Sequence, residues 1–148
     1  MDETMVTELD KKVAHSLRDL VTRMNRRLRK QISNPEQLSV SELNVIQLLV
    51  DSRELLPSEL CAQLNLSSQY ISQVLNKLTE LGYISRKAAT TDKRKSYAVI
   101  NGKGSKWLAD SREEREEWLA MAISKQYSAA DKALIQKAVE LLAVLPEL

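Results

Sequence analysis

Four uncharged polar side chains recur at helical spacing near the middle of the chain. They stand three or four residues apart, at Gln69, Ser72, Gln73 and Asn76, which places them on one face of a helix. The amides of Gln and Asn can pair with N6 and N7 of adenine, so such a face suits the DNA major groove. The same spacing is also typical of a helix face exposed to water, and the pattern alone favours neither interpretation.

The residues that flank this face offer contacts to phosphate groups. Ser67 and Ser68 stand at the start of the helix, where backbone N–H groups without helical partners attract anions. Lys77 lies at the edge of the polar face, and we expect its ammonium group to meet a phosphate. Such contacts position a duplex without reading its sequence.

A cationic segment follows the polar helix. Residues 85–106 contain seven basic residues and one acidic residue, Asp92. We expect Arg94 to insert into the minor groove and Asp92 to hold the shape of the hairpin tip by accepting hydrogen bonds. The basic residues assigned to phosphate contacts are Arg86, Lys87, Lys93, Arg94 and Lys95. An alternative is that these charges prevent an exposed hairpin from aggregating, but together the hairpin and the polar helix favour DNA binding.

The bulk charge of the chain does not indicate a nucleic-acid partner. The 148 residues include 22 basic and 20 acidic residues, a net charge of +2. Acidic residues gather in the first ten positions and at 113–117, so the basic segment is local. A basic patch on a nearly neutral protein limits non-specific adhesion and is typical of a specific binder.

The composition excludes several other classes of protein. One cysteine, Cys61, rules out an internal disulfide, and one histidine, His15, leaves no His/Cys cluster for a metal. There is no catalytic His/Cys/Asp grouping and no Gly-rich phosphate loop, so we expect neither an enzyme nor a bound cofactor. No apolar run reaches membrane-spanning length and no signal peptide begins the chain, which predicts a soluble, cytoplasmic protein. Cys61 is expected to be a small buried hydrophobic residue.

Hydrophobic periodicity and helix-boundary signals predict six helices and one hairpin. Ser39 and Glu42 form a capping-box pattern, Pro57 suits a first helical position, and Gly82 suits a left-handed helix end. Ser67, Asn101 and Ser128 are the expected N-caps of the later helices. The predicted helices cover 6–32, segments from 39 and from 57, 67–81, 101–125 and a segment from 128, and the predicted strands cover 83–87 and 96–100.

The order of these elements predicts a mainly α fold of the α+β kind. Three helices followed by a hairpin, from residue 39 to residue 100, form the order of a winged helix-turn-helix. The long helices before and after it carry apolar stripes that need another surface to bury against. A second copy of the same helices would supply that surface, so we expect a homodimer.

Four segments of the chain carry motifs of a known family. Asp92-Lys93-Arg94 fits a D-x-R signature in the wing, and Ile100-Asn101-Gly102-Lys103-Gly104 follows where relatives usually have L-T-x-x-G. Residues 78–86 match the pattern that joins the recognition helix to the wing, and residues 58–64 match the third helix. In these motifs the chain resembles the MarR family of bacterial winged-helix transcriptional regulators, over nearly its whole length.

The resemblance implies a division of the chain by role. It implies a single domain over residues 1–148, with a DNA-binding lobe at 38–100 and dimerisation helices at 1–36 and 102–148. The fourth helix would enter the major groove, and the Arg94 wing the adjacent minor groove, of a double-stranded, pseudo-palindromic operator. Many relatives repress transcription until a small aromatic or anionic effector, or an oxidant, changes the separation of the two DNA-reading lobes. We therefore expect a sequence-specific repressor of this kind.

Three positions depart from the family pattern. Gln73 stands where many relatives have Arg, Asn101 replaces the usual Thr, and Leu56 lies where relatives often have a capping Thr. The uncharged helix face and the low net charge keep a second hypothesis open. In that hypothesis the chain is a winged-helix interaction module that binds a protein partner and does not bind DNA.

Overall fold

The computed structural model describes residues 5–148; residues 1–4, among them Asp2 and Glu3 of the acidic N-terminus, lie outside the described residues. The chain divides into two compact units. One unit is Ser33–Arg112, and the other combines the described part of Met1–Ile32 with Glu113–Leu148. One helix, α5 (Gly102–Gln126), crosses the boundary and contributes residues to both units.

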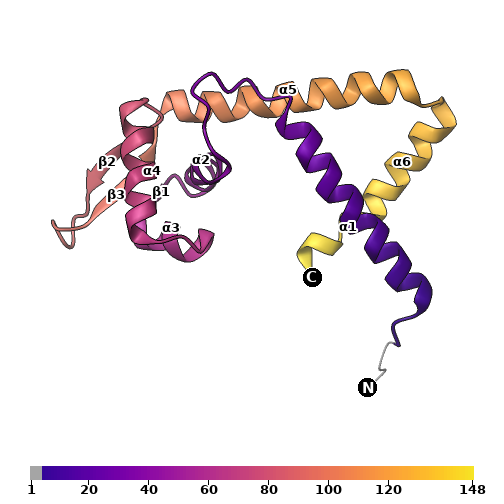
Figure 1. Ribbon diagram of the computed structural model, residues 1–148, viewed down its shortest axis with the longest axis horizontal. Helices are drawn as coiled ribbons and strands as arrows, with labels where there is room; N and C mark the ends of the chain where they lie inside the picture. Colours follow the sequence, from indigo (N-terminus) through magenta and orange to yellow (C-terminus); the bar gives the residue numbers. More distant parts are fainter. Residues whose placement is uncertain (1–4) are drawn as a thin grey trace. The chain divides into compact units, whose positions relative to one another are not determined.

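The Ser33–Arg112 unit holds the elements of a winged helix-turn-helix (Figure 1). Its helices are α2 (Val40–Ser52), α3 (Pro57–Leu64), α4 (Ser68–Glu80) and the first part of α5. Its strands are β1 (Glu54–Leu55), β2 (Ile84–Ala88) and β3 (Ser96–Ile100), which form one antiparallel sheet in the order β1-β3-β2. The mainly α, winged helix-turn-helix fold predicted from the sequence is confirmed.

The sheet has three strands, whereas the sequence pattern predicts two. The additional strand, β1, pairs Leu55 with Ala98 of β3. Arg53, with a φ of 69°, turns the chain from α2 into β1, and its carbonyl oxygen accepts a hydrogen bond from Ile100 N–H (3.1 Å). Two residues are too few for the alternating pattern by which strands are recognised, so β1 leaves no periodic signal in the sequence.

Most helix ends in this unit follow the predicted boundary residues. At the start of α2, Ser39 Oγ accepts a hydrogen bond from Glu42 N–H (3.2 Å), and the Glu42 carboxylate accepts one from Ser39 N–H (2.8 Å). Gly82, with a φ of 79°, follows α4 in the left-handed conformation. Leu56 offers no side-chain cap to α3, and the Glu59 carboxylate accepts a hydrogen bond from Leu56 N–H instead (2.6 Å).

A single apolar core lies between the helices and the sheet of this unit. Its members are Leu38, Val45, Ile46, Leu49, Leu55, Leu60, Ile71, Val74, Leu75, Leu78, Tyr83, Ile84, Ala98 and Leu108. Cys61 packs against this core, as its sequence neighbours predict, but it is half-buried, whereas the sequence predicts a buried residue. Because α4 turns its whole apolar stripe inward, the opposite face of the helix is left to solvent.

The start of α5 packs closely against the end of α4. The Asn101 side-chain amide donates a hydrogen bond to the Gly82 carbonyl oxygen, and its Oδ1 accepts one from Gly104 N–H (3.0 Å). Asn101 therefore caps α5, as predicted. A Cβ atom on Gly104 would lie 2.4 Å from the Tyr83 carbonyl oxygen, so this close approach requires glycine.

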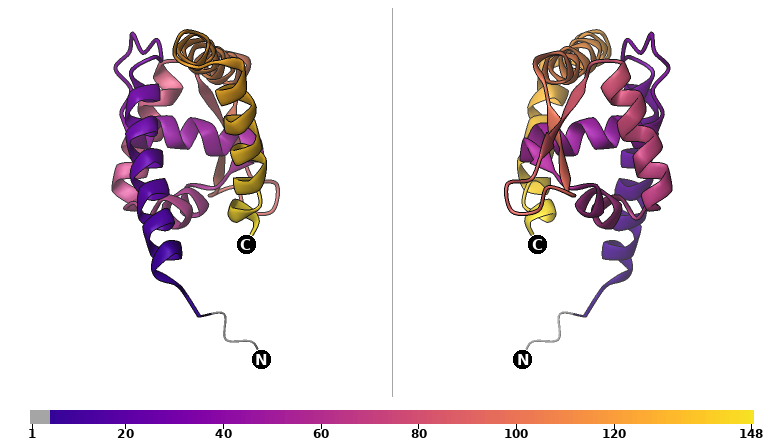
Figure 2. Two further views of the ribbon diagram at one scale, coloured as in Figure 1. Left: turned by 90° about the vertical axis from the view of Figure 1, so that its right-hand side faces the viewer. Right: turned by 90° about the vertical axis from the view of Figure 1, so that its left-hand side faces the viewer.

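The described part of the second unit is helical (Figures 1 and 2). It contains α1 (Glu8–Arg29), the remainder of α5, α6 (Ala129–Leu142) and a short 3₁₀ helix, η1 (Leu145–Glu147). Helix α1 is shorter than the predicted range of 6–32 at both ends: it begins after a capping box formed by Thr7 and Asp10, and Lys30 follows its last residue as the C-cap. No residue of α1 or α6, both of which the structure describes in full, is buried.

Candidate nucleic-acid interface

Helix α4 presents its polar face to solvent. Its inner side buries Ile71, Val74 and Leu75 in the core. Ser67 Oγ accepts a hydrogen bond from Tyr70 N–H (3.2 Å) and so caps the helix, as predicted. Six of the residues predicted to contact DNA are exposed on this helix or at its start: Ser67, Ser68, Gln69, Ser72, Gln73 and Asn76. The structure therefore brings these six together on one accessible surface.

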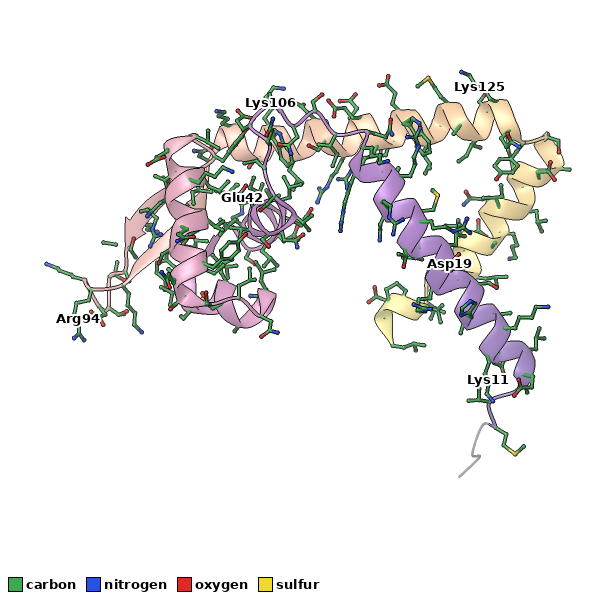
Figure 3. All side chains as sticks on the ribbon, in the orientation of Figure 1. Lys11, Asp19, Glu42, Arg94, Lys106 and Lys125 are labelled. Atoms are coloured by element: carbon green, nitrogen blue, oxygen red, sulfur yellow. The ribbon has the colours of Figure 1, made fainter. Side chains whose placement is uncertain are left out.

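Lys77 differs from the other predicted contacts on α4. Its ammonium nitrogen lies 3.0 Å from Glu42 Oε1 and 2.9 Å from Glu42 Oε2, and it donates to both oxygens. The Lys77 side chain is 42% exposed, whereas that of Glu42, labelled in Figure 3, is 10% exposed. The structure directs Lys77 toward α2, whereas its position in the sequence predicts a phosphate partner.

Two of the predicted basic residues are held against the sheet. The Arg86 guanidinium donates through Nε to Ser96 Oγ (3.3 Å) and through Nη2 to the Ser96 carbonyl oxygen (3.3 Å). The Lys87 ammonium group lies 3.4 Å from Glu54 Oε2 on strand β1 of the same sheet. These contacts orient the base of the hairpin, and both side chains remain exposed.

The hairpin tip is organised by Asp92. Its carboxylate accepts hydrogen bonds from Arg94 N–H (3.0 Å), Nε (3.2 Å) and Nη2 (3.3 Å), and its carbonyl oxygen accepts one from Lys95 N–H (3.0 Å). These side-chain and backbone hydrogen bonds from Arg94, and the nearby Lys95 charge, lower the pKa of the Asp92 carboxyl group. The expectation that Asp92 holds the tip by accepting hydrogen bonds is thus confirmed. The Arg94 side chain is 91% exposed and points away from the sheet (Figure 3).

A hollow of about 340 Å³ lies between the hairpin and the start of α3. Its lining consists of Leu56, Pro57, Ser58, Arg86, Arg94, Lys95 and Ser96. Three cationic side chains and the positive end of a helix make the hollow suitable for a phosphate group. Ser58 is not among the residues predicted from the sequence, since only the folded hairpin brings the start of α3 beside Arg86.

The part of the chain that the structure describes offers neither a metal site nor a membrane span. Within residues 5–148, no group of three or more His, Cys, Asp and Glu side chains could hold a metal ion. Over the same range, no helix has the length and apolar character needed to span a membrane. The single histidine, His15, is exposed on α1.

The fold and the surface together define the class of the protein. Helices α2, α3 and α4 precede the β2–β3 hairpin, strand β1 between α2 and α3 completes the small antiparallel sheet, and the hairpin projects beyond α4 with its cationic tip (Figures 1 and 3). Helix α4 exposes an uncharged polar face in the same packed unit. This arrangement is that of a winged helix-turn-helix protein.

Comparison with known proteins identifies the family. The family model described as MarR family matches residues 36–95. A protein from Pseudomonas aeruginosa PA01, assigned as a transcriptional regulator and known from a crystal structure, is 30% identical. That match covers 97% of this chain and 99% of the other, with a TM-score of 0.81. The chain belongs to the MarR family of transcriptional regulators.

Two further relatives extend the comparison. An uncharacterised helix-turn-helix transcriptional regulator of Mycobacterium bovis is 23% identical over 137 residues, which is 92% of this chain and 94% of the relative. A mutant of MepR from Staphylococcus aureus, solved bound to an oligodeoxyribonucleotide, is 15% identical with a TM-score of 0.69. That match covers 90% of this chain and 97% of the MepR chain.

Proposed function

We propose that the protein is a homodimeric, sequence-specific repressor that binds a pseudo-palindromic operator in double-stranded DNA. A small aromatic or anionic effector releases it from that operator. The observation that carries the proposal is the exposed, uncharged face of α4 beside a cationic hairpin within one packed unit. The MepR structure bound to an oligodeoxyribonucleotide supports this use of the fold.

In the proposed complex, α4 lies in the major groove. Gln69, Gln73 and Asn76 turn their amides toward the bases, and adenine is the base that pairs best with a side-chain amide. Ser72 adds a smaller polar contact on the same face, while Ser67 and Ser68 meet phosphates at the helix start. Sequence preference then depends on the amides, and the orientation of the helix on the duplex depends on the phosphate contacts.

The hairpin supplies affinity in this proposal. Arg94 enters the minor groove while Asp92 holds its guanidinium, and the other basic residues of the hairpin contact phosphates. About three or four contacts in each subunit predict a dependence of log K on log salt concentration with a slope of about −5 to −7 for the dimer. Tight binding therefore weakens by orders of magnitude as salt rises.

The exposed apolar faces of α1 and α6 support the proposed homodimer. Leu9 of α1 is 69% exposed and Leu134 of α6 is 70% exposed, although both belong to apolar stripes. We assign dimerisation to residues 1–36 and 102–148 and DNA binding to residues 38–100. A dimer presents two copies of α4 to two half-sites about one helical turn apart. The regulator acts in the cytoplasm, where its operator lies.

Binding-site selection with the purified protein, followed by affinity measurements over a series of salt concentrations, tests the proposal. Arg94→Ala should weaken binding to every sequence and reduce the salt slope by about 0.9 for each phosphate that is no longer neutralised. Gln73→Ala should relax the preference at one base pair in each half-site, by about 1–3 kcal/mol of discrimination. Absence of any selected sequence, together with a stoichiometric protein partner that still binds hairpin charge reversals, would favour the interaction-module hypothesis.

A further inference from the structure

Lys77 is the one predicted DNA contact on α4 that is not fully exposed. The six other predicted residues on or before this helix are exposed, and Lys77 alone is half-buried. Its neighbour on the polar side, Gln73, points to solvent one turn earlier. The ammonium group of Lys77 is directed toward the edge of the helix, where α2 begins.

Glu42 receives the ammonium group in a well-defined geometry. Both carboxylate oxygens accept from Lys77 Nζ, at 3.0 and 2.9 Å, and Oε2 also accepts from Ser39 N–H at 2.8 Å. Glu42 as a whole is 8% exposed and is one of two buried polar residues among those described. Because this carboxylate is shielded from water, its attraction to Lys77 is screened less than that of a surface ion pair.

The same carboxylate therefore connects two helices. Through Ser39 it closes the capping box at the start of α2, and through Lys77 it holds the last turns of α4. Helix α2 supplies Val45 and Ile46 to the core beneath α4. The contact between Glu42 and Lys77, separated by 35 residues in the sequence, is thus a directional link at the margin of an apolar interface.

A directional link matters because apolar packing determines which face of a helix turns inward but leaves room for small rotations about the helix axis. Hydrophobic burial is non-directional, whereas a charged hydrogen bond specifies distance and angle. On a helix of about 10–12 Å diameter, a rotation of about 20° moves a side-chain tip by roughly 2 Å. Such a shift breaks a hydrogen bond between an amide and a base edge.

We propose that Glu42 and Lys77 are positioning residues that fix the rotation of α4, and so aim Gln73 and Asn76 at their bases. Lys77 supports sequence preference through Glu42 and makes no phosphate contact, in contrast to the role predicted from its position in the sequence. This inference rests on the proposed DNA-binding function. It adds a specificity role for a residue of α2, a helix that carries none of the predicted DNA contacts.

The test compares Lys77→Gln, Glu42→Gln and the double variant with Lys93→Gln as a matched control. Lys93 is an exposed lysine of the hairpin tip, and Gln at position 42 retains the capping-box pattern. Affinity is measured for the selected operator and for an unrelated duplex of equal length, over a series of salt concentrations. Circular dichroism establishes that each variant is folded.

Lys77→Gln should leave the salt slope unchanged and lower the ratio of operator affinity to unrelated-duplex affinity roughly tenfold, the value of one bidentate base contact. Glu42→Gln should lower this ratio to the same extent, and the double variant no further, because either change removes one charge of the same ion pair. Lys93→Gln should do the opposite, reducing the slope by about 0.9 for each phosphate that it leaves unneutralised while the ratio stays constant.

Two results would overturn the inference. One is a salt slope that falls as much in Lys77→Gln as in Lys93→Gln, since Lys77 would then contact a phosphate. The other is a double variant whose ratio falls about a hundredfold, the product of independent effects. A wild-type protein that binds no duplex would be a different failure, because it would remove the proposed function itself. In that case a urea-unfolding double-mutant cycle at the two positions would still disprove the link if the two changes were additive.

Discussion

The two compact units of the chain treat similar apolar side chains in opposite ways. In the Ser33–Arg112 unit, Leu49, Leu75 and Leu78 are completely buried. In the other unit, Leu134 and Leu141 of α6 remain largely exposed, and neither α1 nor α6 buries a single residue over its described length. One unit completes its core within the chain, whereas the other does not.

The unit that contains α1 and α6 has an apolar hollow on its surface. An apolar hollow of about 580 Å³ lies between α1 and the end of α6. Leu9, Val13, Leu17, Val21, Leu142 and Leu145 contribute to its lining. Apolar area of this kind is seldom left exposed on a monomer, which is why we assign the terminal helices to a dimer. Under the proposed function, the Ser33–Arg112 unit would contact DNA and the terminal helices would set the spacing between two such units.

The largest effect is expected from a charge placed on the exposed apolar face. Leu134→Glu should convert a dimer into monomers of 16.8 kDa. Removing two leucines from one symmetric interface costs about 3–6 kcal/mol, which weakens dimerisation at least about a hundredfold. Light scattering after size exclusion measures the mass. Lys132→Glu, at an exposed polar position of the same helix, should remain a dimer; a dimeric Leu134→Glu protein would contradict the assignment.

Truncation of a buried leucine in the Ser33–Arg112 unit should have a smaller effect than disruption of the proposed dimer interface. The effect should still be larger than that of truncating an exposed leucine. On the monomeric Leu134→Glu background, Leu75→Ala should lower the free energy of unfolding by about 2–5 kcal/mol, because it leaves a cavity in a closed core. Leu141→Ala on the same background should change it by less than about 0.5 kcal/mol. Urea unfolding measures both. An equal loss of unfolding free energy in Leu75→Ala and Leu141→Ala would contradict the distinction between a closed core in one unit and an open apolar face in the other.

The two glycines at the start of α5 offer a sharper comparison. Gly104→Ala should lower the free energy of unfolding by about 1–3 kcal/mol, because the new Cβ meets the Tyr83 carbonyl oxygen at 2.4 Å and Ile100 Cδ1 at 2.5 Å. Gly102→Ala meets nothing within 4 Å and should be tolerated. Thermal or urea denaturation distinguishes them, and a Gly104→Ala protein as stable as Gly102→Ala would show that α5 does not pack as closely as described.

The smallest expected effect concerns the ionisation of a buried tyrosine in the closed unit. Burial, and then the hydrogen bond and charge of Glu36, raise the pKa of Tyr83 to about 12. A tyrosine whose pKa is raised on folding stabilises the fold below its unfolded value near 10, and this contribution is lost as pH rises toward about 12. Between about pH 9 and 11 the wild type should therefore lose about 1 kcal/mol of stability relative to Tyr83→Phe, which has no group to ionise. Parallel pH dependence of the two proteins, measured by urea unfolding, would place Tyr83 in contact with water.

Local signals in the sequence predicted much of the fold. Capping residues such as Ser39, Ser67 and Asn101 act within three residues of their own position, so the hydrogen bonds that they make in the structure were foreseeable. The apolar stripe of α4 likewise identified its exposed polar face, since each helix residue has a fixed direction. The same reasoning predicted the hairpin and the fold class.

Contacts between distant segments could not be predicted in this way. The ion pair of Lys77 with Glu42 is one such contact, because Glu42 lies 35 residues earlier and no periodicity joins the two positions. Strand β1 exists because β3 offers it a partner, and Ser58 shares the lining of one hollow with Arg86 although 28 residues separate them in the sequence. Each of these contacts joins residues that are distant in the sequence and meet only in the folded chain. Such contacts determine how the predicted DNA-binding side chains are held, whereas the sequence pattern predicts which side chains they are.

Footprinting of the full chain on a selected operator tests the central claim most directly. In the proposed dimer each chain contributes one DNA-binding unit, and the terminal helices of the two chains pack together. Such a dimer should protect two symmetric half-sites, about one helical turn apart. Leu134→Glu should abolish the paired pattern at the same protein concentration. A single protected half-site with the wild type, or a paired pattern that survives Leu134→Glu, would contradict the account.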